Sequence, residues 1–126
     1  MSKRTYHPAH GDILHLNFSP SSGRKFTGPH YGLVLSTVTF SKVTGLCMVV
    51  PATTKYHPEE RILSTQLMVE LPTIPELKQT GWVYTHQIKT IDYRERDASF
   101  VAKVEDDFLI DVMDRVRAFI DPDSVV

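Results

Sequence analysis

Short apolar segments alternate with turn-forming segments over the first hundred residues, which is typical of a protein built mainly from β-strands. Most of these apolar segments are bounded by Gly, Pro, Ser or charged residues. Residues 87–91 fit either a strand end or a short helical turn, and residues 53–60 show no periodicity and are expected to form an exposed loop. The pattern predicts strands over residues 13–18, 31–36, 46–50, 67–71, 81–85 and 100–104.

The hydrophobic period changes after Val104. Acidic side chains at Glu105, Asp106 and Asp107 would occupy the first turn of a helix, where they favour the helix dipole. The pattern predicts a helix of about four turns that ends near Pro122. Apolar residues then recur at spacings of three and four, namely Phe108, Leu109, Val112, Met113, Val116, Phe119 and Ile120.

These elements predict a mainly β fold in which six or seven short strands form one curled sheet, with the C-terminal helix packed on it. The length of 126 residues is that of one ordinary domain, so residues 1–126 are expected to form a single unit. Residues 1–9 and 122–126 are expected to be loosely held, as chain ends commonly are.

Charge is distributed unevenly along the chain, although the net charge is only −1. Residues 1–58 carry six basic and one acidic side chain, whereas residues 59–126 carry eight basic and fourteen acidic side chains. The near-neutral total excludes the strongly basic character of a general duplex-DNA binder. This segregation of charge nevertheless predicts one basic surface that can bind an anion and one acidic surface that repels it.

Cysteine usage and apolar run lengths point to a cytoplasmic protein. Cys47 is the single cysteine and lies in an apolar run, so it is expected to be a buried, inert thiol. The first twelve residues lack the apolar core of a signal peptide, and no run approaches the roughly 20 apolar residues of a membrane span. No spacing typical of zinc ligands is present, so neither a metal nor another cofactor is expected.

Eight sequence landmarks occur in order between Gly11 and Arg96. They are Gly11-Asp12-Ile13, Pro20-x-x-Gly23, Gly28, Leu33-Val34-Leu35-Ser36, Lys42-x-Thr44-Gly45, Val49-Val50-Pro51-x-Thr53-Thr54, Gln87-Ile88-Lys89-Thr90-Ile91-Asp92 and Arg94-x-Arg96. In this order the landmarks resemble those of the MazF/PemK toxins. Each landmark alone is weak evidence, but their shared order and spacing make the resemblance specific.

The resemblance implies an SH3-like small β-barrel of the MazF/PemK/CcdB type with a C-terminal helix. It also implies a homodimer, a metal-independent endoribonuclease that cuts single-stranded RNA, and a disordered antitoxin protein that blocks the site. In the family the chemistry is assigned mainly to an arginine in the loop after Gly28 and to a Thr or Ser after the strand-ending proline. The second is present as Thr53, whereas the first is replaced by His30.

A second departure from the family lies near Gln87. Family members commonly have Asp where this chain has His86, and some lines use that Asp and the residue two before it, here Tyr84, in catalysis. The loop around Arg24 also differs, because Lys25 stands where the family usually has Glu.

RNA cleavage without a metal needs a base for the ribose 2′-OH, an acid for the leaving 5′ oxygen and donors for the phosphorane. An imidazole can serve either proton-transfer role near neutral pH, so His30 and His86 form a self-consistent pair with Thr53 as the third catalytic candidate. Loop aromatics, Phe26, Tyr56 and Tyr84, are candidate platforms for bases. The RNA-binding candidates are Arg24, Lys25, Thr54, Lys55, Tyr84, Gln87 and Lys89.

Inert alternatives remain open for these residues. His30 fits a surface histidine without chemistry, and His86 fits a hydrogen bond to a backbone carbonyl. Thr53 and Thr54 fit an ordinary hydroxyl turn. Trp82 is expected in the core, since a strand that follows Gly81 would turn it inward. Of the remaining histidines, His15 is expected within a strand, His7, His10 and His57 are expected to be solvated, and all four are expected to be inert.

Three functions therefore differ in kind. The first is an active endoribonuclease toxin. The second is a catalytically altered relative that binds RNA or an antitoxin-like peptide and acts as a regulator, which the two histidine replacements favour. The third is a gyrase poison like CcdB, whose C-terminal residues carry the activity. The ending Ser124-Val125-Val126 lacks the Trp-Gly-Ile of those toxins, which places this function last.

Overall fold

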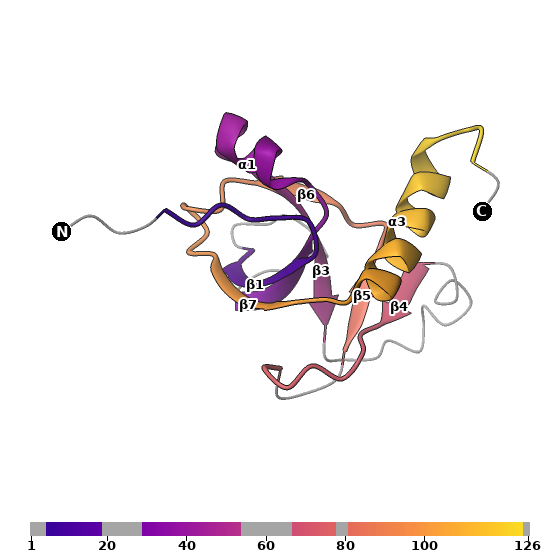
Figure 1. Cartoon of the computed structure of the whole chain (residues 1–126), viewed down its shortest axis with the longest axis horizontal. Helices are drawn as coiled ribbons and strands as arrows, with labels where there is room; N and C mark the ends of the chain where they lie inside the picture. Colours follow the sequence, from indigo (N-terminus) through magenta and orange to yellow (C-terminus); the bar gives the residue numbers. More distant parts are fainter. Residues whose placement is uncertain (1–4, 19–28, 54–66, 78–80, 125–126) are drawn as a thin grey trace.

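The computed structural model describes residues 5–18, 29–53, 67–77 and 81–124, and its strands form one antiparallel sheet (Figure 1). The elements are β1 Asp12–Asn17, β2 Pro29–Val34, α1 Val38–Thr44, β3 Cys47–Thr53, β4 Met68–Glu70, β5 Trp82–Tyr84, β6 Lys89–Ile91, β7 Ser99–Lys103 and α3 Asp106–Ile120. The strand order is β4-β5-β3-β2-β1-β7, and β6 also pairs with β3. Among the described strands no pairing joins β7 to β4, so the sheet curls without closing.

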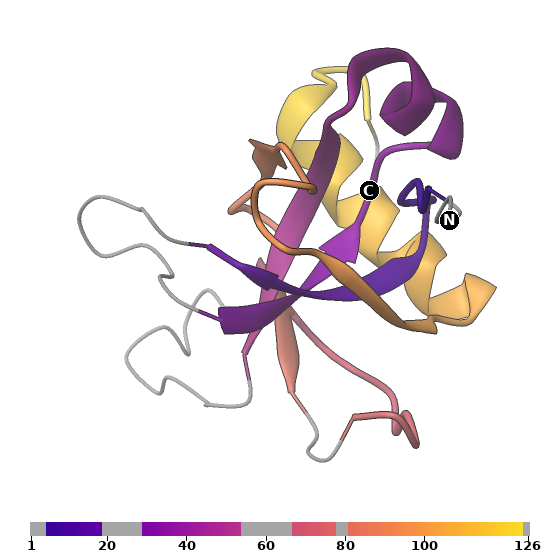
Figure 2. The ribbon, with the colours of Figure 1, turned by 90° about the vertical axis from the view of Figure 1, so that its left-hand side faces the viewer.

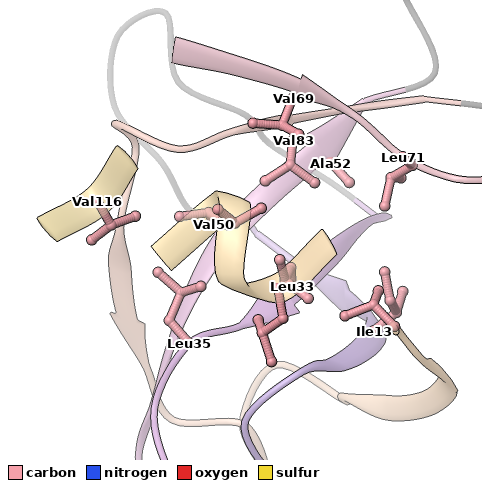
Figure 3. Packing of buried hydrophobic residues seen from close by; sticks show 12 residues of the cluster. Ile13, Leu33, Leu35, Val50, Ala52, Val69, Leu71, Val83 and Val116 are labelled. Atoms are coloured by element: carbon pink, nitrogen blue, oxygen red, sulfur yellow. The ribbon is translucent and has the colours of Figure 1, made fainter. Parts of the chain in front are cut away.

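Alternation of side chains along the strands produces two separate hydrophobic cores, one on each face of the sheet. We call the first the helix-side core because α3 supplies part of it, as Figure 3 shows for Val116. It comprises Ile13, Leu33, Leu35, Val50, Ala52, Val69, Leu71, Val83, Val104, Leu109, Val112 and Val116. The second, the inner core, comprises Leu14, Leu16, Phe18, Val34, Cys47, Val49, Ile91 and Tyr93.

The mainly β fold with a C-terminal helix, predicted from the hydrophobic pattern, is confirmed. The helix α3 lies across one face of the sheet (Figure 2), and α1 lies apart from α3 on the other side of the molecule (Figure 1). None of the helices in the described ranges is long and apolar enough to cross a membrane.

The helix α1 was not predicted, although its sequence contains capping signals. Thr37 caps its N-terminus, where the Thr37 hydroxyl oxygen accepts a hydrogen bond of 3.2 Å from the backbone N–H of Phe40. Gly45 ends the helix with a positive φ of 75° and donates its N–H to the Ser41 carbonyl at 2.9 Å. At seven residues, α1 is too short for a hydrophobic period to reveal it.

The expectation that residues 5–9 are loose is wrong, because side chains of other elements hold this segment. The Ser41 hydroxyl donates a hydrogen bond of 2.7 Å to the Pro8 carbonyl. The Nδ1 atom of His7 lies 3.0 Å from the Tyr93 hydroxyl, so His7 is not merely solvated. These partners lie more than thirty residues away along the chain and cannot be read from the local sequence.

Asp12 at the start of β1 completes the attachment of the N-terminal segment. This carboxylate is 3% exposed, accepts hydrogen bonds from the Tyr6 hydroxyl and the Ala9 N–H, and lies 3.0 Å from the Lys103 ammonium. Burial, followed by the hydrogen bond to Asp12, raises the pKa of Tyr6 far above its ordinary value. The raised pKa favours the protonated hydroxyl that donates the hydrogen bond to Asp12.

The thiol of Cys47 gives a direct test of the inner core. Burial raises the pKa of Cys47 from 9.0 to about 12, because the thiolate would lose its hydration. We expect native protein at pH 8 to react very slowly with a thiol reagent such as dithionitrobenzoate. Unfolding in guanidinium chloride should expose the thiol and release one equivalent of thionitrobenzoate per chain, because Cys47 is the single cysteine. Rapid stoichiometric reaction in native buffer would contradict the burial of β3.

Candidate functional site

Three side chains from adjacent strands form a row across the sheet. Thr53 of β3 pairs with Trp82 of β5. Tyr31 of β2 pairs with Ala52 of β3, and continuation of this antiparallel register by one residue places His30 opposite Thr53. Directly opposed residues have Cβ atoms about 5 Å apart. We call His30, Thr53 and Trp82 the site row.

The site row lies on the face of the sheet that α3 does not cover. Leu33, Val50 and Val83 belong to the helix-side core, and each lies an odd number of positions from the site-row residue on its own strand. Because successive side chains point to opposite faces, the site row shares the face of the inner core. The sheet thus separates the candidate site from the helix.

Phe18 joins His30 to one of the predicted RNA-binding residues. The ring centroids of Phe18 and His30 are 6.2 Å apart, and the Lys89 Nζ atom lies 5.6 Å from the centroid of the Phe18 ring. Lys89 pairs with Val49, an inner-core residue, and therefore lies on the same face as the site row. The structure thus brings a cation and an imidazole to the same buried aromatic ring, which had not been predicted as part of a site.

His86 lies in the turn between β5 and β6. Its ring is exposed and contacts the Tyr84 ring edge-on, with centroids 5.9 Å apart. The turn is held by the Thr85 hydroxyl, which donates a hydrogen bond of 2.8 Å to the Leu67 carbonyl, and by the Gln87 N–H, which donates to the Tyr84 carbonyl at 3.3 Å. Both flanking strands pair with β3, so this turn runs beside the middle of β3.

Two predicted site residues have environments that differ from the sequence-based expectation. Thr53 was expected in an exposed loop, but it is the last residue of β3 and is 6% exposed. Tyr84 is 2% exposed, and this burial leaves no ring face on which a base could stack. Four RNA-binding candidates and two candidate platforms lie outside the described residues, namely Arg24, Lys25, Thr54, Lys55, Phe26 and Tyr56.

A glycine holds the two strands of the site row close together. A Cβ atom added to Gly81 would lie 2.4 Å from the Thr53 carbonyl oxygen, well inside the distance at which atoms can pack. The Gly81 carbonyl also accepts a hydrogen bond of 2.7 Å from the Leu71 N–H. A glycine at this position therefore permits the approach of backbones that sets Trp82 beside Thr53.

Trp82 is the residue whose place was most clearly misjudged. It is partly exposed and lies in the site row, whereas its neighbour Val83 is completely buried in the helix-side core. The period of two along a strand means that Trp82 and Val83 cannot share a face. Only one of the two residues can face α3, and in this structure it is Val83.

Four acidic side chains lie on α3, behind the sheet, namely Asp106, Asp107, Asp111 and Asp114. Asp111 forms an ion pair of 3.2 Å with Arg115, and Asp114 forms one of 3.3 Å with Arg117. These partly exposed pairs contribute little to stability. The exposed Glu70, by contrast, lies at the end of the site row, because it opposes Trp82 in the β4–β5 register. No group of three or more potential metal ligands occurs among the described residues.

The chain and its fold match a known family of toxins. The model of the PemK-like, MazF-like toxins of type II toxin–antitoxin systems matches residues 9–120. The chain belongs to this family. This membership confirms two predictions made from the sequence, the MazF/PemK family and the toxin class.

Individual relatives share much of the chain. The endoribonuclease toxin MazF of Escherichia coli K12 is 32% identical over 96 residues, which cover 75% of this chain and 77% of that protein. A crystal structure of MazF from Deinococcus radiodurans has 29% identity and a TM-score of 0.77, and the match covers 91% and 97% of the two chains. A MazE–MazF structure from the same organism has a TM-score of 0.72 at 29% identity, with 90% and 96% covered. The enzyme class predicted from the sequence agrees with the name of the E. coli relative.

Proposed function

We propose that this chain is the toxin of a type II toxin–antitoxin system and acts in the cytoplasm as a metal-independent endoribonuclease on single-stranded RNA. Family membership carries the toxin class, and the endoribonuclease name of a relative at 32% identity supports the activity. The site row supports the location, because it places an imidazole beside a hydroxyl on the face opposite the acidic helix.

The reaction proposed for this site is attack of a ribose 2′-OH on the adjacent phosphorus. One of the pair His30 and His86 takes the 2′-OH proton, and the other gives a proton to the departing 5′ oxygen. The products are a 2′,3′-cyclic phosphate and a 5′-OH. The Thr53 hydroxyl donates a hydrogen bond to a non-bridging oxygen, and the Lys89 ammonium balances the charge of the phosphorane.

The remaining RNA contacts are assigned to the basic N-terminal half of the chain and to the β5–β6 turn. Arg24, Lys25 and Lys55 supply positive charge to the RNA backbone, while Thr54 and Gln87 supply hydrogen bonds. Tyr84 contributes through its edge contact with His86, which limits the orientations of the imidazole ring.

A disordered antitoxin protein is the proposed partner that controls this activity, and the toxin itself is proposed to be a homodimer. The MazE–MazF structure from Deinococcus radiodurans supports the first proposal. An acidic antitoxin segment would complement the net charge of +5 carried by residues 1–58, and would compete there with RNA.

Expression of the wild-type chain provides the test of this function. We expect induction to arrest growth and to produce new RNA 5′ ends, mapped by primer extension on total RNA. Purified protein should cut a single-stranded RNA in the presence of EDTA and leave an all-deoxy strand intact, because that strand lacks the attacking 2′-OH. Growth arrest and cleavage should both disappear when the cognate antitoxin is co-expressed. Cleavage that EDTA abolishes would contradict the proposed chemistry.

A second candidate function is a catalytically altered relative that binds RNA or an antitoxin-like peptide as a regulator. It is favoured by the two positions at which this chain has His30 and His86 in place of the arginine and aspartate usual in the family. Growth arrest without new 5′ ends would support this candidate over the endoribonuclease.

A further inference from the structure

Trp82 provides an aromatic surface directly beside the candidate catalytic residues. It opposes Thr53 in the β3–β5 register, so their Cβ atoms are about 5 Å apart, and it lies on the same face as His30. From this position we propose that Trp82 stacks on an RNA base next to the scissile phosphate and contributes to the choice of cleavage site. This inference rests on the proposed endoribonuclease function.

Burial distinguishes Trp82 from Phe18 and Tyr84, two other aromatic residues that the structure describes around the site. Phe18 and Tyr84 are each 2% exposed, so neither presents a ring face to a ligand. Trp82 is partly exposed on the same face. An indole has the largest aromatic face of the side chains, and stacking on such a face is how proteins commonly hold unpaired bases.

The backbone around Trp82 is held in place before any RNA arrives. Gly81 packs against the Thr53 carbonyl and accepts a hydrogen bond from the Leu71 N–H. Trp82 itself lies between Thr53 on one strand and Glu70 on the other, in the middle of a three-stranded register. Because this backbone is already ordered, it does not have to be fixed when RNA binds, and less of the stacking energy is lost.

The position also suits a role in selecting sequence rather than in proton transfer. Stacking against an indole favours a nucleotide that carries an unpaired base over an abasic one, and the stacking energy differs among the bases. Thr53 and Lys89 address the phosphate, which is the same in every nucleotide, so they cannot distinguish one sequence from another. Trp82 supplies the recognition of a base that these two residues do not.

The test uses a series of short RNA substrates in which one nucleotide at a time is abasic. In the wild-type protein, removal of the base that stacks on Trp82 should raise KM about tenfold, whereas removal of distant bases should have little effect. Trp82→Leu should show the raised KM on the intact RNA and no further rise at that abasic position. Trp82→Phe should retain most of the wild-type pattern, because it keeps a ring.

Fluorescence supplies an independent readout, because Trp82 is the single tryptophan of the chain. Saturable quenching of its emission is expected on titration with an uncleavable 2′-O-methyl RNA. A fully abasic strand of the same length should bind through charge, as measured by anisotropy, without quenching. Phe119→Leu is the matched control, since this exposed aromatic residue lies on α3 behind the sheet.

The outcomes separate the two proposals. If the wild-type protein cleaves RNA but Trp82→Leu has an unchanged KM and an unchanged abasic profile, the assignment of Trp82 fails and the endoribonuclease stands. If the wild-type protein neither binds nor cleaves RNA, both fail. Emission that changes on addition of antitoxin but not of RNA would make Trp82 part of a protein interface and would also overturn the inference.

Discussion

Replacement of His30 or His86 by glutamine is expected to lower the rate of RNA cleavage by about 10²–10⁴-fold, the usual contribution of a general acid or base. Glutamine retains a polar side chain of similar reach but cannot exchange a proton at neutral pH. Both proton transfers belong to one displacement. The cleavage rate of the double variant should therefore be only slightly lower than that of the less active single variant.

A fluorogenic single-stranded RNA provides the measurement, and thermal melting shows whether each variant is folded. His15→Gln is the matched control. His15 is an exposed strand histidine that contacts the Tyr31 ring, and it lies on the face of the helix-side core. This control should cleave at the wild-type rate. Full activity in both His30→Gln and His86→Gln would rule out the mechanism proposed here.

Gly81→Ala is expected to reduce both stability and cleavage. The added Cβ would lie 2.4 Å from the Thr53 carbonyl oxygen, so β3 and β5 must separate at the site row. Overpacking of this kind costs about 1–3 kcal/mol, equivalent to a fall in Tm of roughly 4–12 °C for a domain of this size. Displacement of Thr53 by an ångström should lower cleavage by about 10²-fold.

Gly45→Ala separates the effect on the site from the general cost of losing a glycine. Gly45 has a positive φ of 75°, but a Cβ there would meet nothing within 4 Å. This variant should lose about 1 kcal/mol through backbone strain and retain the wild-type kcat and KM. Equal losses of activity in the two variants, measured on protein shown to be folded, would mean that the Gly81 contact has no special link to the site.

Most strands and the C-terminal helix were predictable because their signal is local. A period of two over residues 14–18 arises from side chains that face the inner core, and periods of three and four after Val104 arise from side chains that face the helix-side core. Even so, α1 escaped prediction because seven residues are too few for a period. Residues 5–9 were misjudged because their partners, Ser41 and Tyr93, are distant in sequence.

The amino-acid sequence by itself determined the family, the mainly β fold with its C-terminal helix, and the candidates His30, Thr53 and Lys89. Order and spacing of residues along one chain are sufficient for these conclusions. Only the tertiary structure decided which of these candidates meet. Strand register sets Thr53 opposite Trp82 and carries His30 into the same row, because register depends on pairing between residues far apart in the chain. The face that α3 covers then decided that Val83 is buried and that Trp82 lies beside the site.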